Sequence, residues 1–351
     1  MKLRPWRVCA TLTLLLAYGL ACAAEPAAKA ATDAAATCLG AKESPEQSID
    51  HCTAAAAEKL PDERRAAVLT RRGLAWFAKG ELVKAGDDLD LAISLNAASA
   101  WTRNARGVVW MQKGDMVRAI DDFDAAVRLK PDYAFALANR GNAWLGKGDP
   151  ERALADLDAA LRLAPPQVEL VHTWRGRAWL AKGELAQAGA AFEAALQANP
   201  RYANAVDGRG YVHFCQGDFD AAARDFAQEW QLRPDAESAV ALIIARRRGG
   251  HDGKAELEEA AKRYGSDKGL PTALALLSGA VTPEQALQAT ADADANVQRQ
   301  RVCTANFVVG EWHAVKGDAA QARQYLKVAR ESCAMSVPEY AAAGAELARL
   351  K

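Results

Sequence analysis

The sequence predicts an all-α solenoid built from repeated helix-turn-helix units, and three regular features support this. A glycine returns every 34 or 35 residues, a second glycine follows each of these by seven residues, and an alanine follows the second glycine by five. A fixed period near 34 with small residues at fixed offsets is typical of a unit that buries its apolar face only by stacking on its neighbours. Such stacks usually bind other molecules. The positions are Gly73, Gly107, Gly141, Gly176 and Gly210; Gly80, Gly114, Gly148, Gly183 and Gly217; and Ala85, Ala119, Ala153, Ala188 and Ala222.

The composition is ordinary for a folded, soluble protein. Half of the 351 residues are apolar and a quarter are charged. The 44 basic and 44 acidic residues cancel, so no net field draws the protein to nucleic acid or to an anionic membrane. We expect no nucleic-acid partner. A solenoid core grows linearly with chain length, so we expect one extended body.

The N-terminus has the pattern of a Sec-type signal peptide, residues 1–24. Lys2, Arg4 and Arg7 precede the apolar run 8–20, which is too short for a stable membrane anchor, and small residues follow at 21–24. We therefore expect a periplasmic protein.

Leu20-Ala21-Cys22 also resembles a bacterial lipobox, whose cysteine becomes lipidated. That pattern has leucine three residues before the cysteine, where this chain has Gly19. An outer-membrane lipoprotein is therefore the alternative, and we expect contact with a membrane only if Cys22 is lipidated.

Export changes how the cysteines are interpreted, because disulfides persist outside the reducing cytosol. In the repeat frame, Cys303 and Cys333 fall at the same end of an antiparallel helix pair, so a disulfide between them is sterically sensible. Cys38 and Cys52 enclose a short loop ahead of the first unit. We predict these two disulfides, one at each end of the array. Cys215 is predicted to be a buried, apolar side chain, and a reactive thiol is the alternative.

The chain divides into segments in a simple order. Ser44-Pro45-Glu46-Gln47 is a capping-box sequence that opens a helix to Lys59, and Gly310 with Gly317 repeats the glycine frame after a gap. The predicted segments are 25–60 as tether and capping helix, 61–234 as five units, 235–300 as degenerate helical hairpins, 301–336 as a sixth unit and 337–351 as a closing helix.

Each repeated residue has an expected mechanical role. The first glycine lies where the two helices of a unit cross closely, and the second ends the first helix in a left-handed conformation. The next residue is expected to cap the second helix with its carboxylate. These residues are Glu81, Asp115, Asp149, Glu184 and Asp218.

An arginine precedes the first glycine of every regular unit, and an aspartate follows that glycine by fifteen residues in four of the five. The two positions face each other across the helix hairpin. We therefore predict Arg-Asp pairs and expect Arg175, which has Ala191 opposite, to find another acceptor. The predicted pairs are Arg72 with Asp88, Arg106 with Asp122, Arg140 with Asp156 and Arg209 with Asp225.

Aligned units such as GVVWMQKGDMVRAIDDFDAAVRLKP and GRAWLAKGELAQAGAAFEAALQANP resemble the tetratricopeptide repeat (TPR) family. The glycines, the aromatic residue three after the first glycine, the alanine and the final proline all stand at family positions. Ala97, His213 and Glu229 depart from the pattern. The resemblance implies a right-handed superhelical solenoid of TPR units, with capping helices, that binds a protein or peptide.

The cysteine-flanked ends narrow the resemblance. Ile49-Asp50-His51-Cys52-Thr53 and the last unit with Cys303 and Cys333 resemble exported proteobacterial TPR proteins. That group includes envelope lipoproteins similar to NlpI.

The TPR resemblance implies that the first helices line a concave groove. Reading the helical face that the groove requires gives an apolar and aromatic set of residues suited to a helix or an extended peptide. Two alternatives remain open: some of these residues pack under the neighbouring unit, or the terminal helix of the chain fills the groove. The candidate partner-binding residues are Phe77, Trp101, Asn104, Met111, Phe135, Asn142, Arg177, Tyr211 and Phe214.

No sequence pattern indicates an enzyme. No histidine pair has helical metal-ligand spacing, no glycine-rich phosphate loop follows a strand, and Gly-x-Ser-x-Gly is absent. We expect no catalytic, metal-binding or cofactor-binding residues and no cofactor. The predicted function is a periplasmic scaffold or adaptor; the alternatives are a lipid-anchored outer-membrane assembly factor and an accessory subunit of an envelope hydrolase or protease. The sequence does not specify an oligomeric state.

Overall fold

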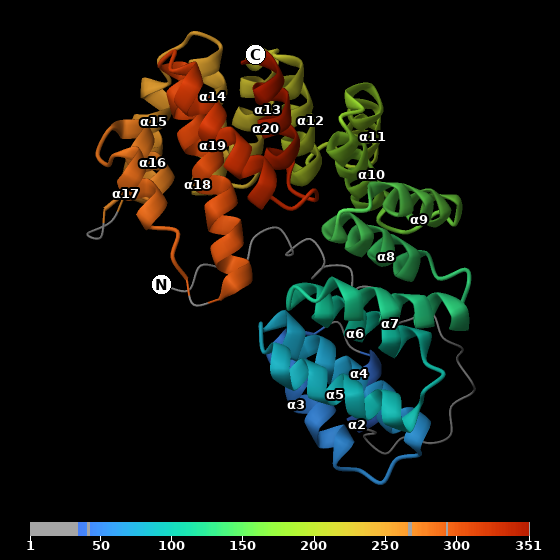
Figure 1. The fold of residues 1–351 in the computed structure, drawn as a ribbon. Coiled ribbons are helices and arrows are strands. Elements are labelled where there is room, and N and C mark those ends of the chain that lie inside the picture. Colours follow the sequence, from blue (N-terminus) through green and yellow to red (C-terminus); the bar gives the residue numbers. More distant parts are fainter. Residues whose placement is uncertain (1–33, 41–42, 266–268, 293, 351) are drawn as a thin grey trace. The chain divides into compact units, whose positions relative to one another are not determined.

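The computed structural model describes residues 34–40, 43–265, 269–292 and 294–350. All secondary-structure elements in these ranges are α-helices, so the predicted all-α fold class is confirmed (Figure 1). The predicted signal peptide and Cys22 lie outside them. No helix in the described ranges is both long and apolar enough to cross a membrane. The contacts divide the chain into two compact units, where we expected one extended body.

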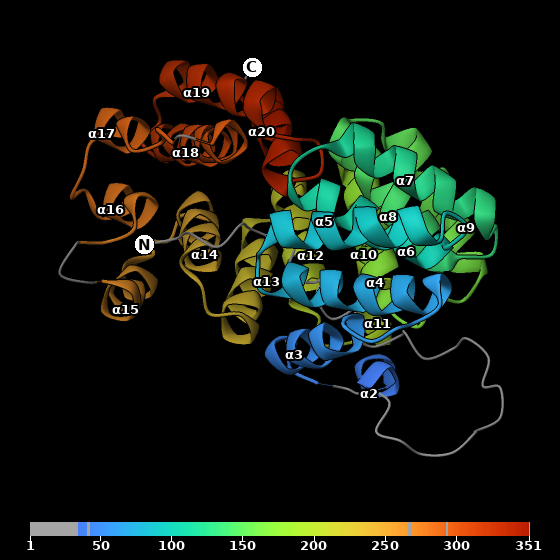
Figure 2. The same cartoon turned by 90° about the horizontal axis from the view of Figure 1, so that it is seen from below.

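Unit 1 runs to Trp144 and includes Arg162–Gln167. Two short helices are followed by helix pairs that lie side by side, α4 with α5 and α6 with α7 (Figure 2). Its helices are α2 (Ala34–Gly40), α3 (Pro45–Ala56), α4 (Asp62–Ala78), α5 (Leu82–Leu95), α6 (Ala100–Gln112), α7 (Met116–Leu129) and most of α8 (Ala134–Lys147).

Unit 2 comprises Leu145–Leu161 and the chain from Val168 onward. Its last helix turns back and packs against α10 and α12, and these contacts between distant parts of the chain make the unit compact. Its helices are α9 (Pro150–Arg162), α10 (Val168–Lys182), α11 (Leu185–Ala198), α12 (Ala203–Gln216), α13 (Phe219–Leu232), α14 (Ala236–Arg248), α15 (Lys254–Tyr264), α16 (Thr272–Ser278), α17 (Pro283–Gln288), α18 (Ala295–Val315), α19 (Ala319–Ser332) and α20 (Pro338–Arg349).

The first glycine of a unit lies against a large side chain of the second helix. A Cβ atom on Gly107 would stand 2.6 Å from Cε1 of Phe123, and one on Gly310 would stand 2.7 Å from Cγ of Leu326. Both distances are shorter than a van der Waals contact between carbons. The two helices of a unit therefore approach this closely only because no side chain stands between them. Gly176 with Phe192 and Gly210 with Phe226 repeat the arrangement.

The turn inside each unit follows the predicted chemistry with one correction. Gly80 and Gly217 have φ angles of +79° and +84°, which glycine adopts without the steric cost of a Cβ atom. Asp115, Asp149, Asp218 and, in the sixth unit, Asp318 accept a hydrogen bond from a backbone N–H at the start of the second helix.

Glu81 and Glu184 make no such bond, although they precede α5 and α11 in the same frame. The prediction that they cap these helices is therefore wrong. Glutamate is one methylene longer than aspartate and does not share its preference for the N-cap position.

The predicted Arg-Asp pairs lie across the helix hairpins. Arg106 donates to both carboxylate oxygens of Asp122, with both N···O distances at 2.7 Å. The hydrogen bond to Asp122 raises the pKa of Arg106, so its charge is permanent. The pairs Arg72 with Asp88 and Arg209 with Asp225 have the same two-point geometry and are confirmed. The pair Arg140 with Asp156 stays a prediction, because Arg140 belongs to the first of the two compact units and Asp156 to the second.

A second series of acidic residues joins three of the repeat units to the repeat unit before them, and sequence analysis missed it. Arg106 Nη1 donates to Asp90 of the preceding second helix at 2.6 Å. Arg140 binds Asp124 and Arg175 binds Asp158, each at 2.7 Å. The expectation that Arg175 finds another acceptor is therefore confirmed. The signal was present in the sequence, since these aspartates recur with the repeat two residues after the first acidic series.

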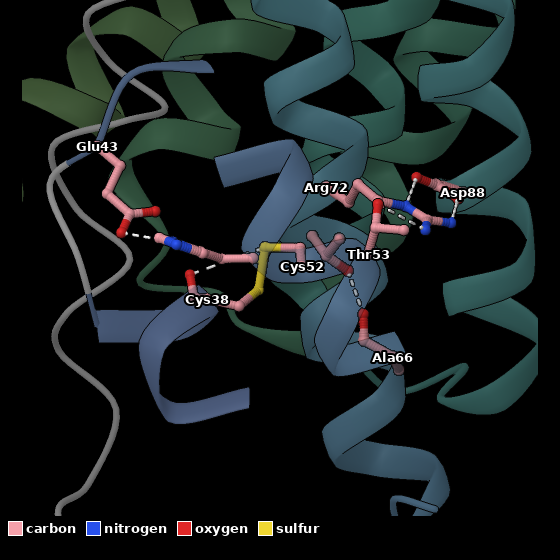
Figure 3. The surroundings of a disulfide bond; sticks show 9 residues. Cys38, Glu43, Cys52, Thr53, Ala66, Arg72 and Asp88 are labelled. Atoms are coloured by element: carbon pink, nitrogen blue, oxygen red, sulfur yellow. Dashed lines mark hydrogen bonds and ion pairs between the residues drawn. A yellow bond between two sulfur atoms is a disulfide. The ribbon is translucent and has the colours of Figure 1, made fainter. Parts of the chain in front are cut away.

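Both predicted disulfides are present. Cys38 joins α2 to α3 through Cys52, and Cys303 of α18 is bonded to Cys333 at the end of α19. Figure 3 shows the first bond, with Thr53 of α3 accepting a hydrogen bond from Arg72 of α4. The predicted capping box at Ser44 and Gln47 starts α3, which ends at Ala56, short of the predicted Lys59. In the chain-entropy account a disulfide stabilises by restricting the unfolded chain, by about 3 kcal/mol for a loop of some 15 residues.

The glycine contacts lead to a first prediction. Gly107→Ala places a methyl group against the Phe123 ring, so it should lower the free energy of unfolding by about 1 to 2 kcal/mol through overpacking. The control is Gly86→Ala, because a Cβ atom there would meet only Lys113 Nζ, at 3.4 Å. Gly86→Ala should leave stability unchanged or raise it by up to about 1 kcal/mol, since alanine favours helix. Urea unfolding followed by circular dichroism measures both, and equal effects would contradict the crossing role.

Candidate partner-binding surface

In unit 1 two of the candidate residues are in the core. Phe77 and Met111 have exposed fractions of 4% and 9% and belong to one apolar cluster with Leu74 and Val108. The expectation that these side chains are available to a partner is therefore wrong. α4 and α6 lie in contact, which buries the helix face that the sequence pattern left facing a groove.

The polar candidate Asn104 is also occupied. Its side-chain oxygen accepts a hydrogen bond from Nδ2 of Asn139 at 2.9 Å, and only 1% of the residue is exposed. On the neighbouring pair of first helices, the Thr70 and Thr102 hydroxyls lie 2.9 Å apart. The polar residues on this face therefore join α4 to α6 and α6 to α8, and Asn104 is not available for the backbone of a bound peptide.

Three candidate residues of unit 1 remain partly exposed, and we call them the unit 1 aromatic face: Trp101, Phe135 and Asn142. Trp101 lies in the first turn of α6 and packs on the edge of the apolar cluster, and Phe135 lies at the equivalent place on α8. The Phe135 ring meets the Tyr133 ring edge-on, with centroids 6.3 Å apart. Partly exposed aromatic side chains of this kind are enriched among residues that dominate protein-protein binding.

In unit 2 the three candidate residues are buried. Tyr211, Phe214 and Arg177 have exposed fractions of 5%, 2% and 9%. Tyr211 packs edge-on against Phe226 with ring centroids 5.1 Å apart, and Phe214 meets Phe307 of α18 at 6.2 Å. The expectation that these side chains form an open surface is therefore wrong, because Tyr211 packs on a ring of α13 and Phe214 on a ring of α18.

The helix α20 packs against both α10 and α12 and lies beside α12 in Figure 1. The sequence left open whether the terminal helix of the chain would cover the first-helix face, and in unit 2 it does. The buried apolar side chains in the middle of α20 are those of Ala341, Ala342 and Ala343, so the helix lies close to its neighbours. The face of α10 and α12 therefore accommodates a helix.

Four charged side chains, which we call the α20 anchor, hold the end of this helix: Arg248, Glu311, Glu346 and Arg349. Arg248 Nη2 lies 2.6 Å from Glu346 Oε2, and Arg349 also pairs with Glu346. Arg349 donates to the carbonyl oxygens of Phe214, at 2.8 Å, and Cys215. These carbonyls belong to the last turn of α12, and that of Phe214 also accepts a hydrogen bond from the backbone N–H of Gly217 at 3.0 Å. Arg349 therefore connects α20 to α12.

Glu311 of α18 lies inside this cluster and is fully buried. Burial, followed by the charge of Glu346, raises the pKa of Glu311 to about 8. Arg248 Nη1 is 3.6 Å from Glu311, a longer contact than its pair with Glu346. Near neutral pH Glu311 therefore keeps its proton and is uncharged. The ion pair of Arg248 is then the one with Glu346.

Cys215 has the buried position predicted for it, with an exposed fraction of 7%. Burial raises the pKa of its thiol to about 12. Because the thiolate is the reactive form, the alternative of a reactive cysteine is disfavoured.

The described residues contain no group of three or more histidine, cysteine, aspartate or glutamate side chains placed to hold a metal ion. The pairing of the four charged residues of the α20 anchor was not predicted from the sequence. A signal for two of them exists, since Glu311 and Glu346 each stand among small or apolar residues, in Val-Val-Gly-Glu-Trp and Gly-Ala-Glu-Leu.

The raised pKa of Glu311 leads to a second prediction. The folded protein holds this proton up to about pH 8, whereas the unfolded chain releases it near 4.5, so stability should fall as pH rises between these values. Glu311→Gln removes this ionisation. The melting temperature of the variant, minus that of the wild type, should therefore increase from pH 5 to pH 8. Thermal unfolding across this range measures the difference, and a constant difference would contradict the assignment.

Comparisons with known proteins agree with the architecture. A family model described as tetratricopeptide repeat matches residues 138–203 and 186–239. A search of curated proteins finds no match to the chain.

Solved structures with the same fold include PilW, with a TM-score of 0.55 and 16% identity over 62% of this chain and 98% of PilW. The pilF protein of Pseudomonas aeruginosa gives a TM-score of 0.51 and 18% identity over 58% of this chain and 93% of pilF. A tetratricopeptide repeat protein from Parabacteroides merdae gives 0.50 and 17% identity over 76% and 92%.

The chain therefore has the fold of tetratricopeptide repeat solenoid proteins, and the tetratricopeptide repeat model matches its residues 138–239.

Proposed function

We propose that the protein is a non-enzymatic scaffold or adaptor that binds a peptide or helix of a partner protein on its first-helix faces. The observation that carries the proposal is α20 on α10 and α12, because a face that already holds one helix has the shape to hold another. Proteins with this fold generally act through protein-protein interactions. Binding of an amphipathic helix in a groove between helices is a recurring mode of peptide recognition.

The unit 1 aromatic face supports the same proposal. Trp101 and Phe135 present ring surface at equivalent places on successive first helices, and Asn142 adds an amide on α8. Tryptophan and other aromatic residues contribute strongly to interface energy because they bury a large area with few rotatable bonds. We propose that a partner segment crosses α6 and α8 at these residues.

We further propose that the protein acts in the bacterial periplasm. The sequence of the signal peptide and the two disulfides support this, since disulfides persist in oxidising compartments. The resemblance of the cysteine-flanked ends to exported proteobacterial proteins, including those similar to NlpI, points the same way.

PilW is described as a type IV pilus biogenesis factor. At 16% identity this similarity shows the fold alone. A role in assembling an envelope structure is therefore an alternative to the proposed scaffold, as is that of an accessory subunit of an envelope hydrolase or protease.

A third prediction tests the unit 1 aromatic face. Affinity capture from envelope extract with the full-length protein should lose at least one partner by about tenfold or more when Trp101→Ala and Phe135→Ala are combined, which is the loss expected for aromatic anchors. The matched control is Trp110→Ala on the same helix, whose ring lies 3.9 Å from the Arg118 guanidinium and outside the aromatic face. The same partners captured equally by all three proteins would refute the proposed face. Thermal unfolding confirms that each variant is folded.

A fourth prediction separates the soluble form from the lipid-anchored form. If the cysteine is removed with the signal, an inhibitor of lipoprotein signal peptidase should leave the amount of precursor unchanged, and so should Cys22→Ala. Immunoblotting of treated cells measures the precursor, with a known lipoprotein as positive control. Accumulation of precursor in the wild type but not in Cys22→Ala would establish the lipoprotein alternative.

A further inference from the structure

We propose that α20 is an autoinhibitory segment, which covers the face of α10 and α12 in the free protein and must leave before a partner helix binds there. This inference concerns the regulation of the proposed binding site and rests on that proposed function.

α20 packs against α19 as well as against α10 and α12, and the apolar side chains that it buries in its middle turns are small. The apolar side chains that α20 buries in its middle turns are three alanine methyl groups, and the larger side chains of Tyr340, Leu347 and Leu350 are only partly buried. Hydrophobic stabilisation scales with the apolar area removed from water, so alanines contribute little each. α20 is also outside the disulfide framework, since the bond that closes α18 and α19 ends at Cys333.

Polar contacts supply the rest of the attachment. Arg349 donates to carbonyls of α12, Arg330 to the carbonyl of Tyr340 at 2.6 Å, and Arg323 to that of Leu350 at 2.6 Å. Inside the fold, Glu346 pairs with Arg248. Removing such charges from water costs nearly as much as their attraction returns, so buried ion pairs fix geometry more than they add stability. The position of α20 is therefore specific, while its net hold is weak enough for competition.

The same contacts define the competing partner. Its helix would present small residues toward α10 and α12, a carboxylate to Arg248, and an arginine near its C-terminus to the carbonyls of Phe214 and Cys215. A partner that adds larger apolar side chains would bury more area than α20 does. The partner must still overcome the high effective concentration of a segment tethered by the short link 334–337.

The test uses the full-length chain and a fluorescent peptide with the α20 sequence, residues 337–350. Ala342 is fully buried, so Ala342→Glu should expel α20 from its site while leaving α10 and α12 unchanged. In fluorescence anisotropy this variant should bind the peptide at least tenfold more tightly than the wild type does. The matched control is Ala348→Glu, an exposed position on the same helix, which should behave as the wild type. A peptide carrying Arg349→Ala should bind the released variant at least tenfold more weakly.

Circular dichroism verifies that Ala342→Glu is folded, and if it is not, Arg349→Ala in the full chain takes its place under the same criterion. Hydrogen exchange of the wild type gives an independent measurement, in which α20 should exchange faster than α12 and α19. Equal peptide binding by wild type and released variant, or exchange of α20 as slow as that of α12, would overturn autoinhibition. The peptide assay involves no natural partner, so a failed capture experiment with intact peptide binding would count against the proposed function alone.

Discussion

The structure depends on one repeated close contact, in which the backbone of a first helix lies against a ring or a leucine side chain of the second helix. Gly107 on Phe123, Gly176 on Phe192 and Gly310 on Leu326 are instances along the chain. Because the contact fixes where the two helices cross, it also fixes which residues on either side of the crossing face each other. The arginine directly before the glycine is thereby brought to the aspartate of the second helix with two-point geometry. The same helix crossing therefore determines both the apolar packing and the Arg-Asp ion pair of a repeat.

Within each of the two compact units, Arg-Asp ion pairs then connect consecutive repeats. Arg106 bridges its own Asp122 and the preceding Asp90, so a single guanidinium takes part in two interfaces. Arginine suits this place because its planar fork offers five donors in fixed directions. Where the regular series stops, other means take over: a disulfide at each end of the array, and in unit 2 a returning helix held by the α20 anchor.

The sequence predicted those contacts that the repeat period determines, namely the contacts inside one helix hairpin. The glycine frame placed Cys303 beside Cys333 and Arg72 beside Asp88, because both relations lie inside one helix hairpin. The burial of Phe77, Met111 and Tyr211 could not be predicted in this way, since it depends on how the neighbouring helices pack against these side chains. Whether Trp101, Phe135 and Asn142 stay exposed depends on the same packing, and these three residues keep part of their surface. The failure of Glu81 to cap α5 shows a finer limit, because one methylene decides whether a carboxylate reaches the backbone N–H.

The burial of Cys215 has a practical consequence for anyone who handles the protein. Among the described cysteines it is the one outside a disulfide, and it belongs to the last turn of α12, whose carbonyl oxygens accept hydrogen bonds from Arg349. With a pKa raised to about 12, the thiol hardly reacts with alkylating reagents at neutral pH until that region opens to water. The rate of its modification therefore counts openings of the native protein. Cys215 is thus a native probe of opening at the contact between α20 and α12, and no cysteine has to be introduced to measure the opening rate.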